Sequence, residues 1–191
     1  MKWITLLIVI IPIQLFAPPL NENHYTKVEE YQTYLKYIEY QRFINDIAYS
    51  ESRLNPLIVN SIGCVGLFQF GKCARKATGS PLITSKDITY NASTKKRYLK
   101  NDSIWSIESQ YSAMDSLIKI NSNHLNKEIS IYCGKYISNV LVTKSGIIAA
   151  AHLAGYSNVK KFLKSDGKHN PKDIYKTSIL MYLDKFKSYE I

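Results

Sequence analysis

Residues 42–56 read RFINDIAYSESRLNP and combine a helical apolar pattern with an ionisable side chain. Ile44, Ile47 and Glu51 are separated by three and four residues, so they lie on one face of a helix. The Asn55–Pro56 pair ends this helix, because the residue before a proline avoids the helical region. The pattern therefore places an ionisable carboxyl group on an apolar face at the end of a helix, where it is expected to be partly shielded from water.

Three short boxes follow one another along the chain. The first is ESRLNP at residues 51–56, the second is GCVGLFQF at residues 63–70, and the third is AAHLAGYSNV at residues 150–159. Together they resemble the signature of the soluble lytic transglycosylases, a family of the lysozyme-like superfamily. That signature consists of a Glu-Ser-x-apolar-Asn-Pro box, a Gly-x-x-Gly-Leu-Met-Gln box and an Ala-Ala-Tyr-Asn-Ala-Gly-x-x-Asn-Val box. The interval from Glu51 to Gly66 matches the family's spacing.

The resemblance implies an all-α, mainly helical, lysozyme-like domain over residues 27–190, with a central buried helix and a glycan cleft. We expect the helix of Glu51 to be buried at the centre of this domain. The cleft is expected between residues 66–69 and residues 152–156. Residues 144–154 are apolar on nearly all sides and also predict a buried helix.

The resemblance also implies cleavage of the β-1,4 bond between N-acetylmuramic acid and N-acetylglucosamine in peptidoglycan, leaving 1,6-anhydromuramyl ends. Glu51 would be the single catalytic group, first protonating the leaving oxygen and then deprotonating the muramyl 6-hydroxyl. Hydrolysis by a lysozyme is an alternative that needs a second carboxylate. No spacing singles one out among Asp87, Asp102, Glu108 and Asp115. A non-catalytic wall-binding or assembly protein on the same fold is the third hypothesis.

The boxes also supply candidate substrate-binding residues. Ser52 is expected to hold the Glu51 carboxyl, Gly66 to permit close backbone approach, and Gln69 to offer a donor and an acceptor to an N-acetyl group. The full set of candidates is Ser52, Gly66, Phe68, Gln69, His152 and Tyr156.

Three positions of the boxes depart from the family pattern. Phe68 replaces Met, His152 replaces Tyr and Leu153 replaces Asn. The His-Leu pair is also similar to phage-type muralytic domains of the superfamily. Protonation of His152 would oppose the positive charge that develops on the sugar. We therefore expect activity to fall below about pH 6.5, the ordinary imidazole pKa.

The charge and the N-terminus indicate where the protein acts. The chain of 191 residues has the length of one domain, and 25 Lys and Arg against 15 Asp and Glu give a net charge of +10. This charge suits an anionic polymer such as nucleic acid, a membrane surface or wall glycan. Residues 1–17 read as a secretory signal peptide and residues 18–26 as a short leader, with an uncleaved anchor as the alternative.

Export disfavours nucleic acid as a partner. We expect peptidoglycan strands as the partner, in the periplasm or outside the cell, and a monomeric protein. An envelope or secretion apparatus is a further candidate partner.

The cysteines and histidines predict neither a zinc site nor another cofactor, because they show no paired ligand spacing. Three cysteines allow at most one internal disulfide in an oxidising compartment. A bridge from Cys133 to Cys64 or Cys73 is favoured, because a helix starting at Gly66 would hold Cys64 and Cys73 too far apart along its axis.

Apolar spacing predicts the remaining elements. Residues 57–65 should form an irregular or hairpin connection, residues 80–104 a loop with short helical turns, and strand signals are scarce. Helices are expected at residues 28–50, 66–79, 107–125, 144–154, 157–163 and 171–186, the first of which could be divided in two.

Overall fold

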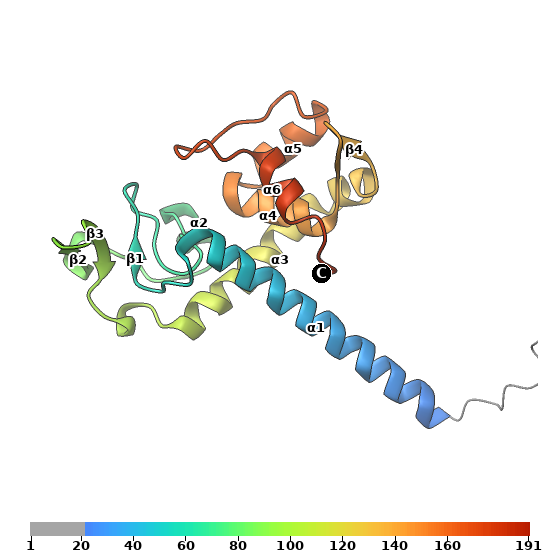
Figure 1. The fold of residues 1–191 in the computed structure, drawn as a ribbon, viewed down its shortest axis with the longest axis horizontal. Helices are drawn as coiled ribbons and strands as arrows, with labels where there is room; N and C mark the ends of the chain where they lie inside the picture. Colours follow the sequence, from blue (N-terminus) through green and yellow to red (C-terminus); the bar gives the residue numbers. More distant parts are fainter. Residues whose placement is uncertain (1–21) are drawn as a thin grey trace, which may run out of the picture. The chain divides into compact units, whose positions relative to one another are not determined.

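A computed structural model of the protein describes residues 22–191 and is mainly helical, as the sequence predicts (Figure 1). The predicted signal peptide of residues 1–17 lies outside the described residues, and the first helix begins within the predicted leader of residues 18–26. The helices are α1 (Glu22–Ser52), α2 (Lys72–Ala77), α3 (Ile107–Tyr132), α4 (Lys144–Ala154), α5 (Tyr156–Lys164) and α6 (Ile179–Lys185). The strands are β1 (Ile58–Val59), β2 (Ile88–Asn91), β3 (Lys96–Leu99), β4 (Tyr136–Ile137) and β5 (Val140–Leu141).

The chain divides into two units, residues 1–35 and residues 36–191. In the first unit the structure describes the beginning of α1, whose residues 26–35 are all exposed. The second unit contains the buried core and every candidate site residue named above. The functional site is therefore described entirely within residues 36–191.

The helix at the centre of the core is α4, and the expectation that the Glu51 helix holds this place is wrong. Helix α1 buries only a short stripe near its end, formed by Phe43, Ile44, Ile47 and Ala48. In α4, by contrast, residues 145–151 are all buried, as the apolar and small side chains of this stretch predict. Helix α4 packs against α3, α5 and α6.

A glycine allows α6 to approach α4 closely. A Cβ atom on Gly146 would lie 2.9 Å from the carbonyl oxygen of Leu183, a separation that no real Cβ contact tolerates. Helix α6 therefore lies against α4 at backbone distance. This contact fixes the position of Tyr182, which precedes Leu183 in α6.

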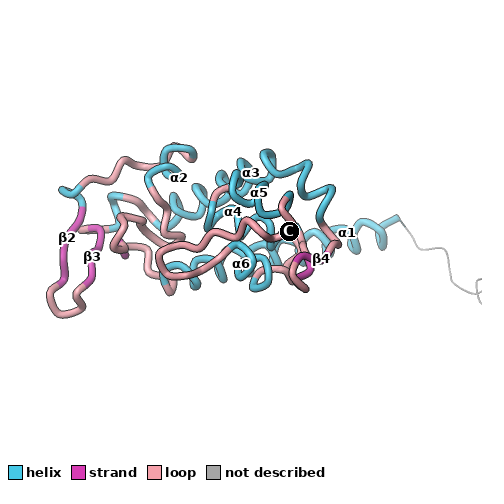
Figure 2. The backbone as a smooth tube through the Cα atoms, turned by 90° about the horizontal axis from the view of Figure 1, so that it is seen from above, coloured by secondary structure: helices cyan, strands magenta, loops and turns pink. Residues whose placement is uncertain are grey.

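The structure contains a three-stranded antiparallel sheet of order β1-β3-β2. Its strands β2 and β3 lie in the segment that was expected to be a loop, residues 80–104. Figure 2 shows β2 and β3 side by side, joined by their turn. Most side chains of β2 are exposed, and β3 buries only Leu99 fully. Pairing of the backbone therefore makes this hairpin, without the alternating apolar pattern that would reveal it in the sequence.

Two predicted helices are shorter than expected. Residues 66–70 are not helical, because Gly66 (φ +81°) and Gln69 (φ +48°) have left-handed backbone conformations, and α2 starts only at Lys72. Residues 171–178 form a loop closed by a bridge between Lys172 and Ser178. Ser178 then caps α6 by accepting a hydrogen bond from the Met181 amide.

The cysteines are free in the structure, so the expected disulfide from Cys133 to Cys64 or Cys73 is wrong. The helical separation assumed for Cys64 and Cys73 is also wrong, since the residues between them are mostly irregular. Within residues 22–191, no helix combines the length and the apolar character needed to cross a membrane.

Candidate active site

Glu51 lies in the last turn of α1, next to the buried end of the helix. Arg53 and Leu54 follow it with positive φ values of 56° and 60°, and they turn the chain out of the helix. The side chain of Glu51 is 17% exposed. The carboxyl group is therefore shielded by protein but still open to a ligand.

Tyr182 holds one oxygen of this carboxyl group. Its hydroxyl donates a hydrogen bond to Glu51 Oε1. Burial, together with the neighbouring Glu51 carboxylate, raises the pKa of the Tyr182 phenol well above its ordinary value. The phenol therefore keeps its proton and remains a donor over the whole working range of pH.

His152 also lies near this carboxyl oxygen. Its Nε2 atom is 4.0 Å from Glu51 Oε1 and 2.9 Å from the carbonyl oxygen of Phe68. Because a carbonyl oxygen only accepts, Nε2 carries the proton of the neutral ring and donates it to Phe68. The other ring nitrogen, Nδ1, is buried and has no hydrogen-bond partner.

Burial lowers the pKa of His152 below its ordinary value, and this effect outweighs the opposing influence of Glu51 and of the Phe68 carbonyl. The imidazole next to Glu51 is therefore neutral near neutral pH. The expectation that its protonation would limit activity below about pH 6.5 must be corrected, because the proton binds only at lower pH.

Two cavities meet at Glu51. The hairpin-side cavity, of about 570 Å³, is lined by residues of the α1 end, of β1 and of the β2–β3 hairpin. The loop-side cavity, of about 130 Å³, is lined by His152, Asp173 and Tyr175 among others. Glu51 and Gln69 line both cavities, so the carboxyl group lies where the two join.

The structure brings together Glu51, Ser52, Gln69 and His152 from the predicted set. Ser52 does not hold the Glu51 carboxyl, as was expected, because its hydroxyl bonds the backbone. It donates to the carbonyl of Ala48 and accepts from the amide of Asn55, both at 3.1 Å. Ser52 thus ends the helix and shapes the turn that follows Glu51.

The side-chain amide of Gln69 is also used partly for structure. Its Nε2 atom donates to the carbonyl oxygens of Gly66 at 2.9 Å and of Ile58 at 3.3 Å. These bonds fix the left-handed turn at Gln69 beside Glu51. The expected donor to an N-acetyl group is thus engaged by the backbone.

Three predicted residues do not line the cavities at Glu51. A Cβ on Gly66 would lie 2.3 Å from Oε1 of Gln110. The missing side chain therefore makes room for Gln110 and not for a glycan. The ring of Phe68 is buried and makes an edge contact with Tyr111, so it cannot bind a substrate directly. Tyr156 stacks on His124 with ring centroids 4.0 Å apart, and neither ring lines the cavities at Glu51.

Gln110 was not singled out by the sequence, although it organises the backbone around the second box. It is fully buried, its Oε1 accepts from the amide of Leu67 at 2.7 Å, and its Nε2 donates to the carbonyls of Pro56 and Trp105. Its place in the helical pattern, between apolar residues of α3, was the available signal.

The carboxylates considered as partners of Glu51 lie elsewhere. Asp87 accepts from Thr84, Asp115 accepts from Tyr40, and neither they nor Asp102 and Glu108 line the two cavities. Asp173 lines the loop-side cavity with Glu51, and the sequence did not single it out. Its Oδ1 accepts from the amides of Tyr175 and Thr177, which gives the loop its shape.

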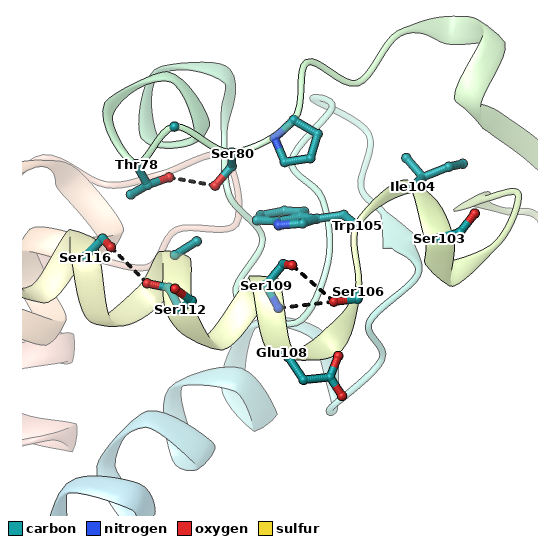
Figure 3. Close-up of a pocket in the computed structure, with 13 residues that line it drawn as sticks. Thr78, Ser80, Ser103, Ile104, Trp105, Ser106, Glu108, Ser109, Ser112 and Ser116 are labelled. Atoms are coloured by element: carbon teal, nitrogen blue, oxygen red, sulfur yellow. Dashed lines mark hydrogen bonds between the residues drawn. The ribbon is translucent and has the colours of Figure 1, made fainter.

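A separate cavity of about 710 Å³ lies between α3 and the segment that follows α2 (Figure 3). Serine residues line much of it, and Glu108 is its one titratable side chain. Several of the hydroxyls are bonded within the protein, as Thr78 is to Ser80 and Ser116 to the Ser112 carbonyl. This cavity lacks the pairing of a carboxyl group with a buried donor that is found at Glu51.

Comparison with known proteins gives no match: no family model, curated protein or solved structure is significantly similar to the chain. In residues 22–191 no group of three or more His, Cys, Asp or Glu side chains is placed to hold a metal ion. The function is therefore inferred from the residues at Glu51 and from their geometry.

Proposed function

We propose that the protein is a lytic transglycosylase of lysozyme-like fold that cleaves peptidoglycan outside the cytoplasm, as a monomer. The observation that supports this best is the environment of Glu51. One carboxyl group lies at the junction of two cavities, accepts a hydrogen bond from the Tyr182 phenol and faces the neutral ring of His152. The three sequence boxes support the same assignment, since two of them supply Glu51 and His152.

In the proposed reaction Glu51 acts twice. It first donates its proton to the glycosidic oxygen as the bond from that oxygen to the muramyl C1 breaks. The 6-hydroxyl of the same sugar then attacks C1, and its proton passes to the Glu51 carboxylate. The products are a 1,6-anhydro end and a free 4-hydroxyl, and Glu51 is protonated again.

Tyr182 and His152 assist the carboxyl group without exchanging protons with the sugar. A hydrogen bond from a phenol to an ionised carboxylate is charge-assisted, so Tyr182 stabilises Glu51 after it has given up its proton. Because the bond is made to Oε1, the other oxygen is left to face the sugar. The neutral imidazole of His152 adds no positive charge next to the developing oxocarbenium ion.

The experiment that tests the assignment of Glu51 is the release of soluble fragments from purified sacculi. The variant Glu51→Gln should release them at least about 100-fold more slowly than the wild type, the usual loss when a general acid is removed. The variant Glu39→Gln is a matched control on the same helix, because Glu39 pairs with Arg42 and lines neither cavity at Glu51. A protein that merely binds wall glycan would release no fragments as the wild type or as either variant.

Hydrolysis is a second candidate reaction, and Asp173 favours it. A retaining lysozyme places a second carboxylate near its acid, and Asp173 lines the same cavity as Glu51. The variant Asp173→Asn keeps an oxygen that can accept the two backbone bonds of the loop. A hydrolase that uses Asp173 should lose nearly all activity in this variant, whereas the proposed transglycosylase should retain most of it.

A further inference from the structure

The two cavities that meet at Glu51 carry opposite charge. Four cationic side chains line the hairpin-side cavity, against the single carboxylate of Glu51. They are Arg53, Lys95, Lys96 and Arg97. The loop-side cavity holds the carboxyl groups of Glu51 and Asp173 and no Lys or Arg, and its imidazole, His152, is neutral near neutral pH. A substrate that spans both cavities therefore meets a strong gradient of charge.

The fold positions these cations. Arg97 of β3 pairs in register with Val59 of β1 and with Tyr90 of β2, so the three side chains lie in one row on one face of the sheet. All three line the hairpin-side cavity. The guanidinium of Arg97 donates to the carbonyl of Asn60, which fixes it at the cavity wall.

The turn of the hairpin adds flexible charges to this fixed one. Lys95 has a left-handed backbone (φ +53°) where the turn enters β3, and both Lys95 and Lys96 are exposed. The ring of Tyr90 is 62% exposed, so it offers a flat apolar surface beside them. The hairpin thus presents an aromatic platform bordered by cations.

The glycan alone does not account for these charges. Its N-acetylated sugars are neutral, whereas the stem peptide attached to the lactyl group of each muramic acid carries free carboxylates. That peptide begins on the sugar whose C1 bond is cleaved, and Glu51 lies at the edge of the cationic cavity. A muramic acid bound for cleavage at Glu51 therefore brings its stem peptide close to the cationic cavity.

We propose that the hairpin-side cavity binds the carboxylates of the stem peptide through Lys95, Lys96 and Arg97, and that the protein selects glycan strands that carry stems. This inference rests on the proposed function. Phosphodiester polymers are another anionic substituent of wall glycan, attached to the 6-oxygen of muramic acid. They are disfavoured, because the proposed reaction needs the 6-hydroxyl of the reacting sugar to be free.

The test compares initial rates on two substrates made from one preparation: intact glycan strands, and the same strands after an amidase has removed the stems. The wild-type full chain should have a kcat/KM roughly tenfold higher on stem-bearing strands, as expected for a few partly exposed ion pairs. In Lys95→Gln/Lys96→Gln this ratio should fall to about three or less, through a higher KM on stem-bearing strands.

A double variant on another face is the matched control. Lys119 and Lys127 are exposed on α3 and line neither cavity, so Lys119→Gln/Lys127→Gln changes the net charge equally and should leave the ratio unchanged. If the ratio of kcat/KM on stem-bearing to stem-free strands fell equally in both double variants, the inference would be overturned, because the effect would come from net charge alone.

The remaining outcomes separate the inference from the proposed function. A wild type that cleaves both substrates equally well would overturn the inference and leave the function standing. A wild type that cleaves neither would overturn both. Strands that lack stems but retain a phosphodiester polymer form a third arm, and a preference that persists on them would overturn the assignment to carboxylates.

Discussion

The hydroxyl of Tyr182 donates a hydrogen bond to Oε1 of Glu51, and the two residues are 131 positions apart in the chain. Glu51 lies in the last turn of the first described helix, and Tyr182 belongs to the last helix. Close packing of α6 on α4, which Gly146 permits, holds Tyr182 in place. The orientation of the candidate acid therefore depends on the final helix of the chain.

The first prediction concerns this hydrogen bond. Replacement of Tyr182 by Phe removes the donor and keeps the buried ring, so the fold should persist. A hydrogen bond to a charged group contributes about 1.5–3 kcal/mol, so kcat/KM on sacculi should fall by roughly 10- to 150-fold.

The control for this variant is Tyr189→Phe. Tyr189 also donates its hydroxyl to a carboxylate of α1, but that carboxylate belongs to Asp46. We expect wild-type kcat/KM. If Tyr182→Phe behaved in the same way, the phenol would have no role in positioning Glu51.

The second prediction is the effect of acid on stability through His152. Its pKa is lowered in the folded state, so the unfolded chain binds the proton first as the pH falls through about 6.5. The contribution of His152 to the free energy of unfolding is therefore fully present above that pH. It decreases on further acidification, by at most about 1.4 kcal/mol per pH unit for one proton.

The variant His152→Gln tests this prediction, because glutamine can still donate to the Phe68 carbonyl but does not titrate. The free energy of unfolding should be measured in urea at pH 7 and at pH 5. The wild type should lose more stability than the variant between these values. Equal losses would show that His152 is not held neutral by burial.

The third prediction separates a close contact from backbone strain. Gly66 and Gly63 both have positive φ values, 81° and 83°, but an added Cβ meets Gln110 at Gly66 and open space at Gly63. The variant Gly63→Ala should lose about 1 kcal/mol from strain alone. Gly66→Ala should lose roughly 3 kcal/mol or more, because Gln110 must also move and release its buried hydrogen bonds.

Urea or thermal unfolding measures both losses. If the two variants were equally stable, Gln110 would not require the glycine at residue 66.

The fourth prediction concerns salt. Lys95 and Lys96 are exposed, so their attraction to stem carboxylates is screened at high ionic strength. The preference for stem-bearing strands should therefore fall severalfold between about 0.05 M and 0.5 M salt. A preference that does not respond to salt would indicate that the stems are recognised through apolar or neutral contacts.

The sequence predicts the parts of the fold that an apolar pattern specifies. The spacing of Met114, Leu117, Ile118 and Leu125 predicts α3, and all four are buried in it. The small and apolar side chains of residues 145–151 predict a buried helix in the same way. The position of Glu51 beside Ile47 predicts the partial burial of the carboxyl group.

The sequence does not predict structure that depends on backbone pairing or on long-range contacts. The β2–β3 hairpin buries few side chains. Gln69 adopts a positive φ, which a glutamine does not favour, so the sequence does not predict it. Tyr182 lies within the helix expected at residues 171–186, and the sequence does not link it to Glu51. Its hydrogen bond to Glu51 is identified only when α6 is packed on the core. The place of Asp173 in the cavity at Glu51 likewise depends on how the loop before α6 folds.

The mass of the muramyl ends released from sacculi distinguishes transglycosylation from hydrolysis. The proposed reaction closes the 6-hydroxyl onto C1, so mass spectrometry of wild-type digests should show 1,6-anhydromuramyl ends, each lighter by one water than a reducing end. Glu51→Gln should produce none above background. Wild-type digests that contain only reducing ends would contradict transglycosylation. If the variant Asp173→Asn released no such ends, hydrolysis by two carboxylates would be established.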